Sequence, residues 1–248
     1  MWHKLVSIGM LVGLWYLLAA FLPASVFPPP HIVVAYLAED IAKGVVWPHM
    51  FATLARIAAG FALAMAFSIP FGILLGFSSL AQRLFDTWVI IGLMTPSLVF
   101  ILLAYTLIGL NDVAAVVATA LTVSWVLTIN ICESAKAVDM KLVQMARVLG
   151  YDTRQIVIRV VLPQLAPPLM ASARFGLGLI WKMVLFVELL GRSNGIGYQI
   201  EFYYQLFSMG RVLEYTLFFV AIMLFIEIVL LGGLERRLFR WRPAVRLA

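Results

Sequence analysis

The sequence predicts an all-α integral membrane protein with about six transmembrane helices. Three observations support this. Of the 248 residues, 64% are hydrophobic and only 12% are charged, whereas a soluble domain is about half apolar and about a quarter charged. The mean hydropathy is +1.03, and long intervals contain no Asp, Glu, Lys or Arg. So few polar residues cannot cover a surface that faces water, and we expect the outer surface to meet lipid.

The charge-free intervals place the spans, because a helix needs roughly 20 apolar residues to cross about 30 Å of hydrocarbon. The interval between Arg56 and Arg83 reaches that length, and two further intervals follow before Glu133. The six predicted spans are approximately residues 5–22, 49–77, 86–109, 113–133, 164–190 and 212–234. We expect them to form one transmembrane domain over residues 1–248. A cleaved signal peptide is the alternative for residues 1–22, but the apolar stretch is long for a signal and a single Lys precedes it.

Basic residues predict the orientation of the spans. Twelve Lys and Arg residues fall on the side that holds the N-terminus, and three fall on the other side. The twelve are Lys4, Arg83, Lys136, Lys141, Arg147, Arg154, Arg159, Arg236, Arg237, Arg240, Arg242 and Arg246, and the three are Lys43, Arg192 and Arg211. Cytoplasmic loops carry such an excess of positive charge. We therefore expect both termini in the cytoplasm, and the net charge of +6 is explained by the loops and not by a nucleic-acid partner.

Two segments lie outside the spans. Residues 31–47 follow a run of three prolines and predict a short external amphipathic helix. The apolar side of this helix would carry Ile32, Val33, Tyr36 and Leu37. Residues 134–163 form the longest hydrophilic stretch and fall on the cytoplasmic side.

The cytoplasmic loop predicts a helix–turn–helix. An apolar stripe at positions i, i+3, i+4 and i+7 indicates a first short helix, and its members are Leu142, Met145, Ala146 and Leu149. Gly150 follows at the position where helices end on a left-handed residue. Asp152 or Thr153 can cap a second helix, whose apolar residues are Ile156, Val157 and Val160. Pro163 then sets the entry into the fifth span.

Geometry alone fits two uses of this loop, because a basic rim of Lys141, Arg147, Arg154 and Arg159 accompanies its apolar edge. The loop could rest on anionic lipid headgroups, or it could dock a cytoplasmic partner. The residue spacing favours the second use. Gln144–Gly150, nine further residues and Val160–Pro163 resemble the EAA loop of binding-protein-dependent ABC importer permeases, E-A-A-x3-G-x9-I-x-L-P. The matching positions are Ala146, Gly150, Leu162 and Pro163, and the departures are Gln144, Met145 and Val160.

The resemblance extends from the second span to the turn after the fifth, in the order typical of the nitrate/sulfonate/taurine/bicarbonate branch. In the second span it rests on Thr53-Leu54-Ala55-Arg56, Gly60-Phe61, Ile69-Pro70-Phe71-Gly72 and Gly76. In the fifth span and the following turn it rests on Arg174-Phe175-Gly176-Leu177-Gly178-Leu179, Trp181, Glu188 and Ser193-Asn194-Gly195-Ile196-Gly197-Tyr198.

The resemblance implies a permease subunit in a bacterial inner membrane, paired with a second copy of itself. Two cytoplasmic ABC ATPase subunits would bind ATP and Mg²⁺, and an extracytoplasmic solute-binding protein would deliver a small organic or inorganic anion. The chain has no G-x-x-x-x-G-K-[ST] loop of its own, so we expect no catalytic residue and no cofactor in it. A stand-alone secondary carrier or channel is the alternative class.

The resemblance also makes the loop a coupling helix that enters a groove of the ATPase. The residues expected to take part are Leu142, Ala146, Arg147, Leu149, Gly150, Tyr151, Asp152 and Arg154. Movement of two such helices would switch the pathway between outward and inward access. This requires partner contacts that differ between the two states.

Ionisable residues within spans normally face a bundle interior, a wet cavity or a partner. Arg56 is expected to snorkel outward or to pair with the external helix, and Arg174 to pack at the interface. Lys182 lies too deep in the fifth span to reach a surface easily. It either lines the translocation pathway or forms a salt bridge, with Glu227 as the candidate partner. Glu188, on another face of the same helix, is a second pathway candidate.

Thr95, Pro96 and Ser97 lie in the third span, where the related permeases often carry Arg-Pro-x-Pro-Pro. The hydroxyls of Thr95 and Ser97 offer hydrogen bonds to a polar solute. Pro96 either breaks the helix toward the pathway or forms an ordinary kink. Because the basic residue of the pattern is absent here, an anionic substrate does not follow from the family alone.

The remaining reactive side chains give no sign of enzyme chemistry. His3, His31 and His49 are scattered along the chain, so no metal site is predicted. The sequence has no H-E-x-x-H or G-x-S-x-G pattern. The glycine-rich residues 191–197 predict a tight external turn, and Cys132 has no second cysteine to pair with.

Overall fold

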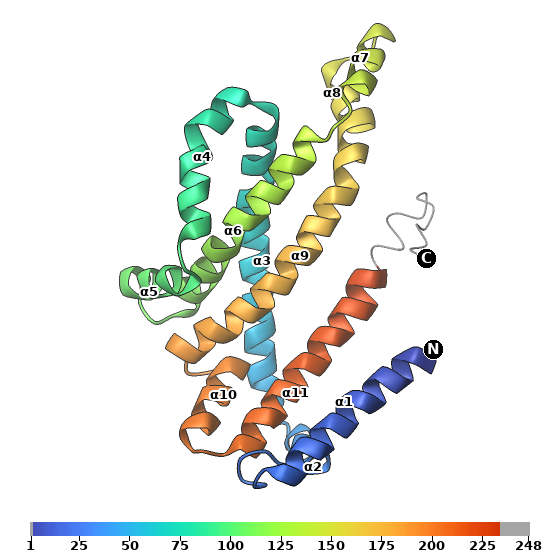
Figure 1. The fold of residues 1–248 in the computed structure, drawn as a ribbon. Helices are drawn as coiled ribbons and strands as arrows, with labels where there is room; N and C mark the ends of the chain where they lie inside the picture. The colour runs from blue at the N-terminus through green and yellow to red at the C-terminus, as the bar shows by residue number, and fades with distance from the viewer. Residues whose placement is uncertain (1, 234–248) are drawn as a thin grey trace. The chain divides into compact units, whose positions relative to one another are not determined.

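The computed structural model describes residues 2–233, which form helices with no strand among them (Figure 1). The prediction of an all-α chain is confirmed for this range. The end of the sixth predicted span at residue 234, the five arginines after it and the side chains of His3 and Lys4 lie outside what the structure describes.

The chain divides into two compact units. One combines the residues before Arg56 with Leu185–Phe225, and the other combines Arg56–Val184 with the segment that begins at Ile226. Two helices contribute residues to both units, namely α3 (Val46–Phe77) and α9 (Leu162–Gly191).

The first unit is completed by α1 (Trp2–Phe21), α2 (Pro30–Lys43), α10 (Ile196–Gln205) and α11 (Met209–Phe225). Helix α2 is the amphipathic helix expected over residues 31–47. It begins at the proline run and ends earlier than expected, because Gly44 adopts a left-handed φ of +76° that closes the helix. Its residue Val33 is completely buried, as the predicted apolar side requires.

Arg211 joins α2 to α11 in this unit. Its guanidinium lies 4.7 Å from the ring centre of Tyr36, 2.8 Å from the carboxylate of Asp40 and 2.9 Å from that of Glu214. A cation held by two carboxylates and an aromatic face fixes the two helices to each other.

The second unit contains α4 (Ser79–Met94), α5 (Ser97–Ile108), α6 (Asp112–Lys136), α7 (Met140–Val148), α8 (Thr153–Ile156) and the π-helical segments η1 (Val157–Val161) and η2 (Ile226–Leu231). Helix α6 lies at its centre, with 12 of its 25 residues buried. Its neighbours come very close. A Cβ added to Gly72 of α3 would lie 2.8 Å from Ile131, and one added to Gly92 of α4 would lie 2.2 Å from the indole of Trp125.

Three helices in the described range are long and apolar enough to cross a membrane, namely Val46–Phe77, Asp112–Lys136 and Met209–Val229. Helices α4 and α5 qualify only as a pair, and they are bent by 94° between Met94 and Ser97. The ordinary proline kink considered for Pro96 is therefore wrong, because the helix is fully broken there. The count of six spans stays a prediction.

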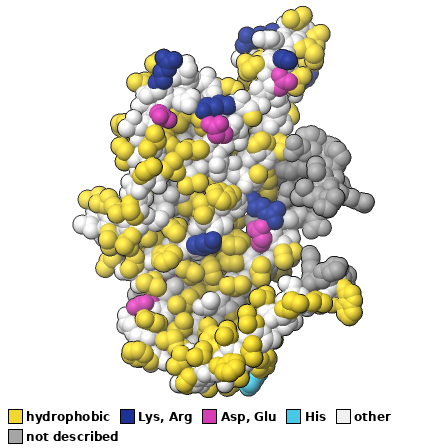
Figure 2. Space-filling view, in the orientation of Figure 1, with side chains coloured by type: hydrophobic (Ala, Val, Ile, Leu, Met, Phe, Trp, Pro, Cys, Tyr) yellow, Lys and Arg dark blue, Asp and Glu magenta, His cyan; other side chains and the backbone are white. Residues whose placement is uncertain are grey.

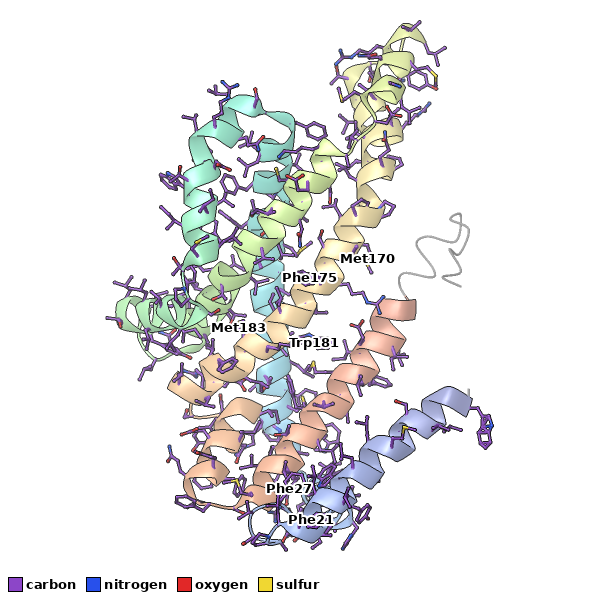
Figure 3. All side chains as sticks on the ribbon, viewed as in Figure 1. Phe21, Phe27, Met170, Phe175, Trp181 and Met183 are labelled. Atoms are coloured by element: carbon purple, nitrogen blue, oxygen red, sulfur yellow. The ribbon has the colours of Figure 1, made fainter. Side chains whose placement is uncertain are left out.

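Hydrophobic side chains cover much of the visible surface, and basic side chains gather over α7 and α8 (Figure 2). On helix α9 the large apolar side chains are distributed along its length, as Met170, Phe175, Trp181 and Met183 illustrate (Figure 3). A helix that is apolar on several faces is suited to lipid or to a protein interior.

Candidate functional site

The elbow, which we define as residues 137–161, connects α6 to α9 and contains α7. The carboxylate of Asp139 caps α7 by accepting the backbone N–H of Lys141 at 2.8 Å. Gly150 follows the helix with a φ of +81°, which confirms the left-handed stop. Asp152 caps α8 through a capping box with Gln155, so the cap is Asp152 and not Thr153.

The second helix of the elbow is not separate from the fifth span. Helix α8 continues through the π-helical η1 directly into α9. Pro163 lies at the start of α9, as the prediction for the entry of the fifth span requires, although no break separates α9 from η1. In the widened turn the N–H of Leu162 bonds the carbonyl of Val157, five residues earlier, and this local change of pattern precedes the proline within one continuous helix.

The apolar residues of α7 divide between two faces. Val143 and Ala146 point inward and pack with Ile156 and Leu165 in a buried cluster. Ala146, at 3% exposure, was expected to enter a partner's groove, and this expectation is wrong. Its small side chain is part of the chain's own core.

The outer face of α7 consists of Leu142, Met145, Val148 and Leu149, all exposed. Val148 is 88% exposed and was not among the predicted residues, because a short helix with apolar residues on both faces does not reveal which of them its own chain buries. Lys141, Arg147 and Arg154 are exposed beside this face, and the guanidinium of Arg159 lies 5.8 Å from the ring centre of Tyr151. The surface is apolar with a basic rim, which suits a protein groove with acidic edges.

A second candidate site lies at the break between α4 and α5. Thr95 and Ser97 line a cavity of about 180 Å³ together with Thr122 of α6 and Leu179 and Met183 of α9. The hydroxyls of Thr95 and Thr122 donate to carbonyls of their own helices, at 2.7 and 2.8 Å. Their lone pairs are left to accept hydrogen bonds from whatever enters.

Lys182 lies between Leu179 and Met183 in sequence, on the helix that forms one wall of this cavity. Its side chain is exposed, and residues 2–233 supply it with no hydrogen bond or ion pair in the structure. The salt bridge considered with Glu227 is wrong. Glu227 instead lies 2.6 Å from the guanidinium of Arg174, so Arg174 does more than pack at an interface.

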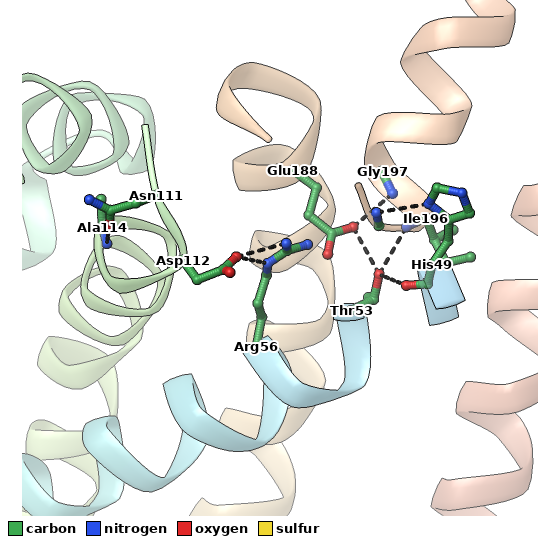
Figure 4. A network of polar contacts seen from close by, with 10 residues as sticks. His49, Thr53, Arg56, Asn111, Asp112, Ala114, Glu188, Ile196 and Gly197 are labelled. Atoms are coloured by element: carbon green, nitrogen blue, oxygen red, sulfur yellow. Dashed lines mark hydrogen bonds and ion pairs between the residues drawn. The ribbon is translucent and has the colours of Figure 1, made fainter. Parts of the chain in front are cut away.

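Arg56 is 4% exposed and bonds the carboxylate of Asp112 through Nε at 2.8 Å and through a terminal nitrogen at 2.7 Å (Figure 4). Asp112 is the first residue of α6. Arg56 therefore neither snorkels nor pairs with the external helix. A carboxylate at a helix N-terminus is itself stabilised there, and it holds the buried guanidinium.

Glu188 belongs to a buried hydrogen-bonded group with Thr53, Ile196 and Gly197, which we call the clasp, and it does not line a pathway in this structure. It has no exposed surface. Its Oε2 accepts hydrogen bonds from the Thr53 hydroxyl at 2.9 Å and from the Gly197 N–H at 2.8 Å, and Thr53 in turn accepts the N–H of Ile196 at 2.9 Å (Figure 4). The expected pathway role of Glu188 is replaced by a structural one.

The clasp explains the two glycines of the turn. Gly195 has a φ of +114°, and a Cβ there would lie 2.3 Å from the Glu188 carboxylate carbon. A Cβ on Gly197 would lie 2.4 Å from the carbonyl oxygen of Leu185. His49 completes the turn by accepting the Gly195 N–H on Nδ1 at 3.2 Å, and its Nε2 lies 2.6 Å from the side-chain amide nitrogen of Gln199. Among residues 2–233 no group of His, Cys, Asp and Glu has the arrangement of a metal site.

Comparison with known proteins agrees with the resemblance described above. Residues 68–240 match the family described as the inner membrane component of binding-protein-dependent transport systems. The chain is 31% identical over 242 residues to an ABC transporter permease protein of Brucella abortus, covering 96% of this chain and 95% of the other. It is 29% identical to an aliphatic sulfonates transport permease protein, SsuC, of Bacillus subtilis, covering 97% and 88%.

The fold is also that of a solved transporter subunit. A chain of the MetNI methionine ABC transporter, in an inward-facing conformation, superimposes with a TM-score of 0.65 at 18% identity, covering 80% of this chain and 97% of the other. Because the family match spans most of the described residues and the Brucella relative aligns over nearly its whole length, this chain belongs to the inner membrane components of binding-protein-dependent transport systems.

Proposed function

We propose that this chain is the permease subunit of an ATP-driven ABC importer that works by alternating access. It pairs with a second copy, binds two cytoplasmic ATPase subunits and receives solute from an extracytoplasmic binding protein. ATP and Mg²⁺ bind the ATPase alone. The observation that carries the proposal is the outer face of α7, where Leu142, Met145, Val148 and Leu149 are exposed beside basic side chains.

The topology proposed with this function has six spans and cytoplasmic termini. It counts α4 and α5 as one broken span and adds α1 and α9 to the three long apolar helices. Its support is the charge asymmetry of the sequence, since the basic residues of the elbow and Arg83 near the start of α4 then share the cytoplasmic side.

The transported solute is proposed to be a small anion such as an aliphatic sulfonate. The sulfonate permease relative supports this class. Lys182 supports it independently, because an ammonium group within a span requires an anionic or hydrated neighbour. The solute would pass the cavity at the α4–α5 break, where Thr95 and Ser97 line the wall and Pro96 ends the helical ladder.

The test uses the complex purified through a tag on this chain and reconstituted in liposomes. The double substitution Val148→Asp with Leu149→Asp places carboxylates in the docked surface, where an unpaired buried charge is costly. We expect the ATPase subunit to be lost from the purified complex and ATP-dependent uptake of radiolabelled ethanesulfonate to fall about tenfold or more, a loss of 1.4 kcal/mol in docking being tenfold.

Gln144→Glu is the matched control, because Gln144 is an exposed residue of α7 and the change adds a carboxylate without altering the apolar surface. It should keep both the ATPase and the uptake. Ala146→Glu is unsuitable as a test, since a buried charge there would unfold the elbow. An intact complex with normal uptake in the double variant would disprove the docking role, and uptake by the chain without any ATPase would favour the stand-alone carrier.

A further inference from the structure

The α-helical hydrogen-bond pattern is interrupted where the elbow joins α9. The π-helical η1 occupies residues 157–161, and Pro163, Pro167 and Pro168 follow within two turns. Proline has no N–H, so the carbonyls one turn before each of them lose their usual donor. Kinks form at such positions. A force applied to the elbow would therefore bend the chain here unless another contact prevents it.

Packing leaves this region open. A cavity of about 300 Å³ separates the end of α6 from the start of α9, lined by Ser134, Ala137, Val138, Pro163, Gln164 and Pro168 among others. Side chains on opposite walls of this open pocket do not pack against each other, so direct contact does not transmit force across it. The apolar cluster around Val143, Ala146 and Leu165 joins α7 to α9 beside the cavity, but it does not fill it.

Gln164 bridges the base of the elbow with both of its polar atoms. Its Oε1 accepts the backbone N–H of Asp139 at 2.9 Å, and its Nε2 donates to the carbonyl of Val160 at 2.9 Å. Asp139 is the N-cap residue of α7. One side chain of α9 is thus hydrogen-bonded to the residue that caps α7 and to the π-helical segment η1.

We propose that Gln164 is a positioning residue for energy coupling, bracing α7 against α9 so that a displacement of the elbow moves α9 instead of bending the chain at residues 157–168. This inference rests on the proposed function for its consequence. The brace between α7 and α9 is a property of this chain alone, so the brace and its effect on transport are tested separately.

The substitution Gln164→Met keeps the length of the side chain and removes both hydrogen bonds. The buried cluster remains, so the elbow should stay folded. In the reconstituted complex we expect ethanesulfonate uptake to fall about tenfold, the factor that two hydrogen bonds supply, while ATP hydrolysis stays within about twofold of the wild type. The number of ATP molecules hydrolysed per solute then rises, which a general loss of folded protein would not produce.

Gln155→Met is the matched control, because the Oε1 of Gln155 accepts the N–H of Asp152 at 3.2 Å, a bond that stays inside the elbow. It should leave the ratio of ATP to solute unchanged. An unchanged ratio in Gln164→Met, or an equal rise in both variants, overturns the assignment to Gln164.

The bracing itself is measured without transport. Spin labels on the exposed positions Gln144→Cys of α7 and Phe175→Cys of α9, in a Cys132→Ala background, report the distance between the two helices in the purified complex. We expect Gln164→Met to broaden or shift the distance distribution and Gln155→Met to leave it as in the parent. No change in Gln164→Met disproves the brace. Absent ATP-dependent uptake in the wild type, combined with a broadened distribution in Gln164→Met, would disprove the proposed function and leave the brace standing.

Discussion

The carboxylate of Glu188 and the hydroxyl of Thr53 share a hydrogen bond of 2.9 Å although 135 positions separate them in sequence. The same carboxylate oxygen accepts the N–H of Gly197. A buried carboxyl group is tolerated when hydrogen bonds satisfy its oxygens. The start of α3, the end of α9 and the turn before α10 are therefore held together by this one side chain.

Gly195→Ala should weaken this clasp. The new Cβ would meet the Glu188 carboxylate and would force an L-residue into a φ of +114°, a strain of about 1–3 kcal/mol. We expect a lower midpoint of thermal unfolding in detergent. Gly178→Ala is the control, because Gly178 is helical and has no atom within 4 Å of the added Cβ. Equal unfolding midpoints for the two variants would show that the clasp accommodates the added Cβ without loss of stability.

The pair of Arg56 and Asp112 predicts an asymmetric response to mutation. Arg56 is 4% exposed and the side chain of Asp112 is 62% exposed. Asp112→Asn removes one charged partner from a buried guanidinium, and a buried charge that loses a partner is destabilising. Arg56→Met leaves behind a carboxylate that water can solvate. We expect the aspartate variant to unfold at the lower temperature, and the opposite order would contradict the burial of Arg56.

Local chemistry explains which parts of this structure the sequence could predict. The apolar composition predicted an all-helical chain, and the stop at Gly150 and the cap at Asp152 depend on a few neighbouring residues. The hydrophilic stretch of residues 134–163 predicted the loop that the structure places between α6 and α9.

Long-range pairing could not be predicted in the same way. Whether Glu227 meets Lys182 or Arg174 depends on the rotation of two helices that are distant in sequence. The burial of Ala146 depends on how α7 packs against Ile156. The 94° break at Pro96 exceeds what a single proline dictates, since proline removes one donor and leaves the bend angle to the surrounding packing.

The absence of a side chain at Gly92 allows α4 to approach α6 closely. An added Cβ would lie 2.2 Å from the indole of Trp125, and Trp125 is held among aromatic neighbours, with the ring of Phe67 at 6.0 Å. Gly92→Ala should therefore destabilise the chain by about 1–3 kcal/mol, the usual cost of overpacking. Thermal unfolding monitored by tryptophan fluorescence measures the change. A midpoint equal to that of Gly178→Ala would mean that α4 can shift outward freely.

Lys182 allows the proposed anion to be tested on a single residue. Lys182 precedes Met183, a residue of α9 that lines the cavity at the α4–α5 break, and residues 2–233 offer its ammonium no ion pair. Lys182→Met should reduce ATP-dependent ethanesulfonate uptake about tenfold, since a charged hydrogen bond contributes about 1.5–3 kcal/mol, and Lys182→Arg should keep most of it. Lys43→Met removes a basic side chain that pairs with Glu39 on α2 and should leave uptake unchanged.

Because the elbow is intact in all three variants, basal ATP hydrolysis should not differ among them. If Lys182→Met transports ethanesulfonate at the wild-type rate and with the wild-type preference over a neutral alcohol of the same size, the ammonium does not contact the solute.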